Sequence, residues 1–182
     1  MELKQAFLFM IGILASTSKE TAEAVIKIMA ENINLIDPDC KEDICKLFHL
    51  ALRCNLEGTS LSRILGLHLH ISDLDLSRIR IYDSGAASLS QALAANSSLT
   101  SLNLSWNQIA DSGATSLSQA LATNSSLTKL NLRGNGIGAS AAASLSQALA
   151  TNSSLTSLDL SWSSIGASGA TSLSQALSLI HI

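Results

Sequence analysis

The chain has 182 residues, of which 47 % are apolar and 14 % are charged, and its formal net charge is −3. This balance excludes a disordered tail, and it lacks the basic surface that is typical of nucleic-acid-binding domains. The longest apolar run covers residues 6–15, whereas a membrane-spanning helix needs about 20 residues. Composition therefore predicts a folded protein that binds neither nucleic acid nor membrane.

Residues 1–58 are predicted to form a helical cap. Leu3–Leu14 is apolar nearly all round, which indicates a buried helix. Thr17–Glu20 has the capping-box pattern that opens a second helix. Leu47–Asn55 fits either a third helix, which begins near Pro38, or a degenerate strand of the repeat described below. We favour the helix and keep the strand as the alternative.

Cysteine and histidine side chains gather before residue 71. Five of them could be combined into a zinc site by residue type alone: Cys40, Cys45, Cys54, His68 and His70. Their spacing matches neither C-x2-C nor H-x3-H, the ligand pairs that structural zinc sites use. We therefore expect free thiols and no bound metal.

A 28-residue repeat begins at Ile71 and runs through four copies without an insertion. Every copy contains Ser-Leu-Ser-Gln-Ala-Leu near its end and carries an isoleucine at the same place. These isoleucines are Ile81, Ile109, Ile137 and Ile165. A repeat of this length predicts an array of stacked units rather than a fold with one central core.

Each copy has two halves with different periods. Residues 102–104 alternate apolar and polar side chains, which predicts a short strand with one buried face. Ala114, Leu117 and Leu121 follow at helical spacing and predict a helix of about three turns. Asn124 comes next and is predicted to end that helix in the left-handed conformation. Stacked copies should therefore form a solenoid with a parallel sheet on the inside.

The motif L-x-x-L-x-L-x-x-N, present at Leu99–Asn107 and Leu127–Asn135, resembles the leucine-rich repeat. The 28-residue length with a full helix is similar to the ribonuclease-inhibitor-like class, which occurs in nucleotide-binding immune receptors, Ran GTPase activators and bacterial effectors. The resemblance implies a right-handed α/β horseshoe segment over residues 59–182, with about four and a half repeats behind the cap. Ile79 and Ser163 replace the motif's asparagine in two copies, where the turns are expected to be looser.

The strand positions that point away from the core differ between copies, whereas the convex helix stays the same. A partner-binding face on the concave sheet predicts this pattern, and drift on an unused surface is the alternative. The predicted partner-binding residues are Asp73, Asp75, Asn103, Ser105, Trp106, Lys129, Asn131, Arg133, Asp159 and Trp162.

Two of these residues are tryptophans at the same place in copies two turns apart. Gly134 occupies that place in the copy between Trp106 and Trp162. A strand spacing of about 4.8 Å predicts rings roughly 10 Å apart, with a cleft over the glycine. Exposed tryptophans beside a cleft are typical anchors of an interface. The alternative is that each indole packs on the neighbouring loop.

Gly134–Ala139 matches the dinucleotide-binding pattern G-x-G-x-x-A, but the sister copies lack these glycines. The segment is therefore interpreted as a loop of the repeat, and we expect no nucleotide and no cofactor. No spacing of serine, histidine and acidic residues suggests a catalytic triad. We predict no catalytic residue and no enzymatic activity.

The resemblance implies a non-catalytic module that binds a protein or peptide partner on the concave sheet. We expect a cytoplasmic protein or a bacterial effector translocated into a host cell. The alternative is a regulatory fragment of a larger immune-receptor-like or GTPase-activating protein. No repeat follows the last strand, so the apolar tail Leu179–Ile182 is expected to fold back over it in a monomer. A dimer through this edge is the alternative.

Overall fold

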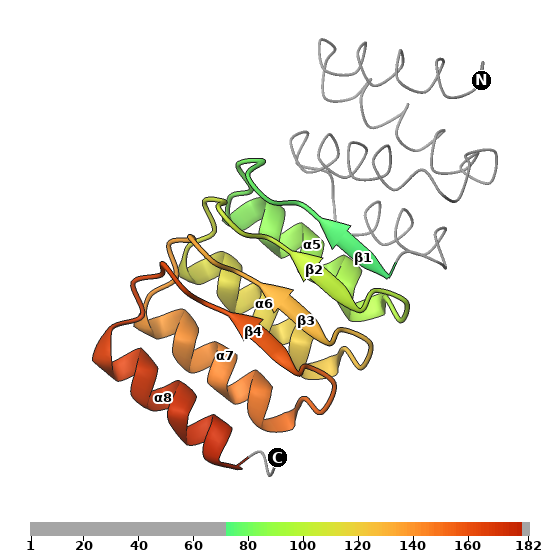
Figure 1. The fold of residues 1–182 in the computed structure, drawn as a ribbon. Coiled ribbons are helices and arrows are strands. Elements are labelled where there is room, and N and C mark those ends of the chain that lie inside the picture. The colour runs from blue at the N-terminus through green and yellow to red at the C-terminus, as the bar shows by residue number, and fades with distance from the viewer. Residues whose placement is uncertain (1–71, 180–182) are drawn as a thin grey trace, which may run out of the picture.

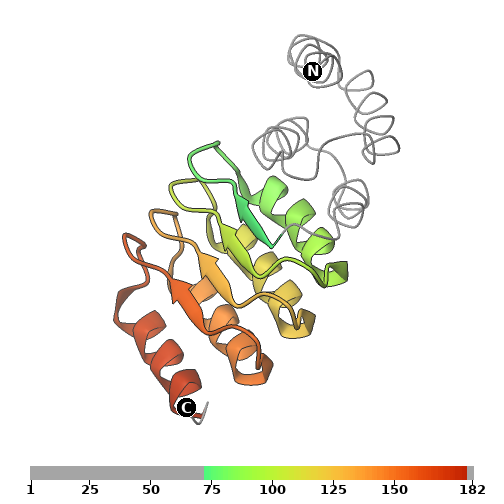
Figure 2. The same ribbon diagram turned by 45° about the vertical axis from the view of Figure 1, so that its right-hand side comes forward.

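The computed structural model describes residues 72–179, with side chains through residue 176, and shows strand–helix repeats stacked side by side (Figure 1). The elements are β1 (Asp73–Asp75), α5 (Asp83–Ala95), β2 (Ser101–Asn103), α6 (Asp111–Thr123), β3 (Lys129–Asn131), α7 (Ala139–Thr151), β4 (Ser157–Asp159) and α8 (Gly166–Leu179). The strands form one parallel sheet in the order β1-β2-β3-β4, and the helices cover one face of it (Figure 2). The predicted α/β solenoid is confirmed.

Neighbouring strands pair in a constant register of one repeat length. Leu74 lies opposite Leu102, Leu102 opposite Leu130, and Leu130 opposite Leu158. This constant register places equivalent side chains of successive repeats in rows that cross the sheet.

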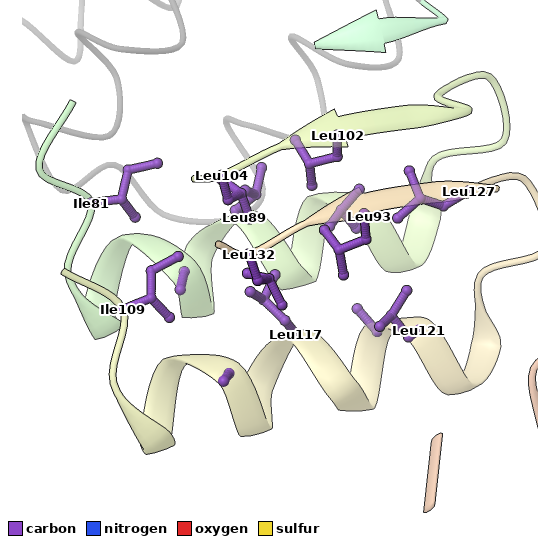
Figure 3. Close-up of a cluster of buried hydrophobic side chains, with 14 of the residues drawn as sticks. Ile81, Leu89, Leu93, Leu102, Leu104, Ile109, Leu117, Leu121, Leu127 and Leu132 are labelled. Atoms are coloured by element: carbon purple, nitrogen blue, oxygen red, sulfur yellow. The ribbon is translucent and has the colours of Figure 1, made fainter. Parts of the chain in front are cut away.

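Apolar side chains from both layers meet between the sheet and the helices. Figure 3 shows Leu104 and Leu132, which follow β2 and β3, pointing into this space together with Leu117 of α6. Leu104 and Leu132 have exposed fractions of 0 %. Full burial of such a side chain contributes about 2 kcal/mol, so the core is held mainly by these rows of leucine.

The fourth repeat is less buried than the other three. Leu155, Leu158, Leu160 and Leu173 are only partly buried. Within residues 72–179, β4 pairs with β3 alone. β4 therefore forms an open edge of the described sheet. The tail Leu179–Ile182 is expected to fold back over this edge, or to form a dimer contact there. Its side chains lie outside the part of the chain that the structure describes.

The loop asparagine of the motif ties adjacent repeats together. The Nδ2 amide of Asn107 donates to the carbonyl oxygens of Leu76 and Leu104, each at 2.9 Å. Its Oδ1 accepts the N–H groups of Ile79 and Ile81 at 3.1 and 3.0 Å. Ile79, which replaces the asparagine in its own repeat, is thus held by the next one, and the looser turn expected there is not seen.

Asn135 repeats this clamp, whereas the fourth copy has lost it. The amide of Asn135 donates to the carbonyl oxygens of Leu104 and Leu132 at 3.0 and 2.9 Å. Its Oδ1 accepts the N–H of Ile109 at 3.1 Å. Ser163 stands at the equivalent place, and its buried hydroxyl has no hydrogen-bond partner among the described residues.

A second asparagine ends each of the first three helices, but not in the predicted left-handed conformation. Asn96, Asn124 and Asn152 have φ angles of −89°, −75° and −80° and an extended backbone, so that prediction is wrong. The Asn124 amide donates to the Leu93 carbonyl oxygen at 2.8 Å, and its Oδ1 accepts the N–H of Leu127 at 2.8 Å. The side chain, rather than a left-handed turn, satisfies the backbone groups at the helix end.

Aspartates at the helix starts form a third link between repeats. Asp83 accepts the N–H of Ala110 at 2.7 Å, and Asp111 accepts the N–H of Gly138 at 2.6 Å. Each carboxylate therefore caps the helix of the following repeat. Ala139 stands at the next equivalent place. The junction between the third and fourth repeats consequently lacks both this link and the loop asparagine.

Several expectations lie outside the described residues. These are the helical cap over residues 1–58, the choice of helix or strand for Leu47–Asn55, the boundary at residue 59, and the free thiols of the cysteines. In the described part of the chain, no helix combines the length and the apolar character needed to cross a membrane.

Candidate partner-binding site

A row of left-handed residues lies on the loops that follow the strands. Arg78, Trp106, Gly134 and Trp162 occupy equivalent places, with φ angles of 59°, 57°, 67° and 59°. A residue with a side chain adopts this conformation at a cost of about 1–2 kcal/mol. The repeat imposes it on all four copies, and these loops stack along one edge of the sheet (Figure 1).

The two tryptophans contact each other, and the predicted cleft is absent. Their ring centroids lie 6.1 Å apart with an interplanar angle of 43°, so the expectation of roughly 10 Å is wrong. Trp106 lies across Gly134, where an added Cβ would come within 2.6 Å of its Cε3 atom. Because Gly134 has no side chain, the indole fills the space that was predicted to be open.

Two arginines complete what we call the tryptophan–arginine cluster, formed by Arg78, Trp106, Arg133 and Trp162. The Arg78 guanidinium carbon lies 5.6 Å from the Trp106 ring centroid. The guanidinium carbon of Arg133 lies 5.9 Å from the ring centroids of Trp106 and Trp162. Cation–π contacts at exposed sites contribute about 0.5–1 kcal/mol each. The four side chains, one from each repeat, are therefore held in a defined arrangement at the protein surface.

The two tryptophans differ in what they leave exposed. Trp106 is 42 % exposed and Trp162 is 72 % exposed. Trp106 packs on the loop of the next repeat, as the alternative prediction had it. Trp162 offers most of its indole to solvent, so it is the stronger candidate for an anchor.

Four of the other predicted site residues have a structural role that the sequence analysis missed. They are Asp75, Asn103, Asn131 and Asp159. In each, the side-chain Oδ1 accepts the backbone N–H of the residue two positions later, at 2.8, 3.1, 3.0 and 2.9 Å respectively. This local turn needs a short side chain with an oxygen acceptor, which explains why only aspartate and asparagine occur there.

The remaining predicted residues are split between surface and interior. Asp73 and Lys129 are exposed on the open face of the sheet, whereas Ser105 is only 6 % exposed. Arg78 was not predicted, although it stands 28 residues before Trp106 and the register of the repeat places the two side by side. The structure thus brings together Trp106, Arg133 and Trp162 and adds Arg78 to them.

Both carboxylates among these turn residues, Asp75 and Asp159, have a lowered pKa. For Asp75, partial burial raises the pKa. Hydrogen bonds from the backbone and hydroxyl of Ser77 and from the Asn103 amide lower the pKa, and together they outweigh the effect of burial. For Asp159, the Ser161 hydroxyl is the main cause of the lowered pKa, followed by the Ser161 N–H, and the charge of Arg133 contributes last. The ionised carboxylates therefore support their turns.

The free energy of unfolding should fall as acid protonates these two carboxylates. A lowered pKa in the folded state contributes stability above about pH 4, the ordinary range of aspartate, and this is lost as pH falls through the folded pKa values. The double substitution Asp75→Asn with Asp159→Asn keeps the turn, as Asn103 and Asn131 do. Urea unfolding between about pH 5 and pH 3 should show a smaller loss in this variant. An equal loss would contradict the assignment.

Gly134→Ala should displace Trp106 and lower the free energy of unfolding by about 1–3 kcal/mol through overpacking. Gly166→Ala is the matched control, because φ is 65° there as well and an added Cβ meets nothing within 4 Å. Near-ultraviolet circular dichroism should change in the Gly134 variant and not in the control. Equal effects in both variants would show that backbone strain, rather than the Trp106 contact, determines the result.

The glycine-rich segment Gly134–Ala139 makes hydrogen bonds to the neighbouring repeat. The N–H of Gly138, which would face a phosphate in a dinucleotide site, donates to the Asp111 carboxylate at 2.6 Å. Asn135 holds the neighbouring repeat through its amide. Within residues 72–179, no group of three or more histidine, cysteine, aspartate or glutamate side chains could hold a metal ion.

Comparisons with known proteins agree with this architecture. A sequence model of the Leucine Rich repeat matches residues 95–118, 123–146 and 151–174. No curated protein sequence matches the chain. Among solved structures, leiomodin-1 actin-binding site 2 is 25 % identical, with a TM-score of 0.55 over 68 % of this chain and 73 % of that one. The tropomodulin C-terminal domain of Caenorhabditis elegans is 18 % identical, with a TM-score of 0.53 over 68 % and 77 % of the two chains. These matches support a leucine-rich repeat protein.

Proposed function

We propose that this leucine-rich-repeat solenoid is a non-catalytic module that binds a protein partner through the tryptophan–arginine cluster and the adjoining concave face of the sheet. The observation that carries the proposal is the exposure of Trp162, 72 %, in a side chain held by Trp106 and Arg133. A held, exposed indole beside a guanidinium has the composition of an interface hot spot. The repeat length and full convex helix also support the ribonuclease-inhibitor-like class.

Selection from a displayed peptide library tests this function for a partner of any sequence. Peptides enriched on the wild-type protein should lose binding to the Trp106→Ala, Trp162→Ala double variant, with a cost of about 2 kcal/mol for Trp162 alone. Gln119→Ala is the control, because Gln119 is exposed on α6, on the opposite face of the solenoid. Circular dichroism must show that both variants are folded. Enriched peptides that bind the double variant as tightly as the wild type would refute the proposal.

Actin is the first named protein that we propose to test as the partner. The support is the shared fold and 25 % identity with leiomodin-1 actin-binding site 2. Co-sedimentation with filamentous actin should be reduced by the double tryptophan substitution and unchanged by Gln119→Ala. Absence of co-sedimentation by the wild-type protein would exclude filamentous actin, while the library selection would still test the general proposal.

We also propose a cytoplasmic setting, either in the producing cell or, for a bacterial effector, in a host cell. The support comes from Asn96, Asn124 and Asn152, each of which begins an Asn-Ser-Ser acceptor sequence for glycans. The amides of Asn124 and Asn152 donate to the preceding repeat, at 2.8 and 2.7 Å for the shorter bond of each. Each of these nitrogens donates two hydrogen bonds to the preceding repeat, and an attached glycan would replace one of the two hydrogens and remove at least one bond. A folded, secreted form that carries glycans at these sites would contradict this setting.

The partly buried leucines beside β4 favour two further candidates. One is a dimer through this edge, with the monomer still preferred. The other is a regulatory role within a larger protein, in which a further segment covers β4. Light scattering distinguishes these states, because a dimer depends on concentration whereas a covered monomer does not.

A further inference from the structure

The carboxylates of the described repeats accept hydrogen bonds within the chain, whereas the basic side chains form no ion pair there. Between residues 72 and 179, five carboxylates accept hydrogen bonds: Asp73, Asp75, Asp83, Asp111 and Asp159. In the same part of the chain, four basic side chains form no ion pair with them: Arg78, Arg80, Lys129 and Arg133. A guanidinium stacked on an indole keeps its N–H donors free at the edge of its plane. Arg78 and Arg133 can therefore bind carboxylates from outside the chain.

The positions of the two guanidinium groups limit the spacing of such carboxylates. Arg78 and Arg133 lie 5.6 and 5.9 Å from the centroid of the same indole, that of Trp106, so their separation cannot exceed the sum of these distances. A polyproline II helix has three residues per turn and rises about 3.1 Å per residue. Acidic side chains three residues apart therefore lie on one face of such a segment, about 9 Å from each other.

The exposed indoles suit the residues between those two acids. Aromatic surfaces bind polyproline II segments because proline rings pack on them and lose little conformational entropy on binding. Both arginines lie against the Trp106 ring and Arg133 also lies against the Trp162 ring, and 42 % and 72 % of the two indole surfaces are exposed. We propose, resting on the function proposed above, that the tryptophan–arginine cluster binds a proline-rich segment of a protein partner with an acidic residue at every third position.

Fluorescence anisotropy with labelled synthetic peptides tests this specificity on the full chain. The probe repeats Glu-Pro-Pro, and the comparison peptides repeat Gln-Pro-Pro and Glu-Gly-Gly. The probe should bind about tenfold or more tightly than either comparison peptide, and added salt should weaken it. Arg133→Gln should weaken the probe by a similar factor. Arg80→Gln is the matched control, because it removes the same charge from an exposed residue outside the cluster.

Each other outcome overturns the inference. Equal binding of the glutamine peptide would remove the role of the carboxylates, and equal binding of the glycine peptide would remove that of the prolines. Equal losses of probe affinity in the Arg133→Gln and Arg80→Gln variants would show that the probe is bound only by general charge attraction. Competition by single-stranded oligothymidine with higher affinity would assign the surface to nucleic acid. If the library selection yields peptides that depend on Trp162 but lack acids and prolines, the proposed function stands and this inference fails.

Discussion

Asn107→Ala should lower the free energy of unfolding by about 3–5 kcal/mol, because it leaves several buried backbone groups without hydrogen bonds. The side chain donates to two carbonyl oxygens and accepts two N–H groups, and three of these four hydrogen bonds cross the junction of the first and second repeats. Each unsatisfied buried group costs about 1–3 kcal/mol, partly offset by water that enters. Chemical unfolding followed by circular dichroism measures the change.

The chain provides a control for this substitution in the same repeat. Asn103 is only half-buried, and its side-chain oxygen accepts a single backbone N–H, that of Ser105 at 3.1 Å. Asn103→Ala should therefore cost about 1 kcal/mol or less. Losses of equal size at Asn103 and Asn107 would contradict the view that Asn107 links the repeats.

Combining Ser163→Asn with Ala139→Asp should raise the stability of the fourth repeat by about 1–3 kcal/mol, since each hydrogen bond gained contributes about 1 kcal/mol. By equivalence with Asn135, the Nδ2 amide of the new asparagine would donate to the Leu132 carbonyl oxygen, and its Oδ1 would accept the N–H of Ile137. The new carboxylate would accept the N–H of Gly166, as Asp111 does from Gly138. Hydrogen–deuterium exchange over residues 155–179 should become slower.

Ala167→Asp is the control for the aspartate. Residue 167 occupies the same place in the repeat as Asp83 and Asp111, at the start of α8, but within residues 72–179 no later repeat supplies an N–H. It should add only the attraction of a carboxylate to a helix N-terminus, about 0.5 kcal/mol. Exchange rates in the double variant that match those of this control would show that the inter-repeat hydrogen bonds do not form.

The fold was predictable because the repeat encodes it four times. The strand leucines and the helical spacing of Leu117 and Leu121 specify one buried face on each element, and only stacking buries both. The motif asparagine predicted a residue that satisfies loop backbone groups, as Asn107 does. The helix-end asparagines were predicted as stops but with the wrong backbone, because the sequence of one repeat does not show that Asn124 reaches into the repeat before it.

The site was only partly predictable, for physical reasons that concern side-chain direction. Strand spacing alone places the Trp106 and Trp162 rings two strands apart, and it takes no account of an indole that tilts over Gly134. Asp75 and Asp159 looked free to contact a partner because alternation places them on the open face, whereas their oxygens close a local turn. Aligning Arg78 with Trp106 through the register of the repeat would have identified it as part of the site.

The constant register also bears on how a gene for such a protein can change. Strand pairing and the asparagine and threonine links join residues one repeat apart, for example Asn124 to Asn96 and Thr128 to Thr100, each 28 positions along the chain. An in-frame duplication or loss of one whole unit between equivalent points recreates the same contacts at the new junction. Unequal recombination between the near-identical units can thus lengthen or shorten the solenoid, and with it the proposed binding surface, in one genetic step, without compensating mutations elsewhere.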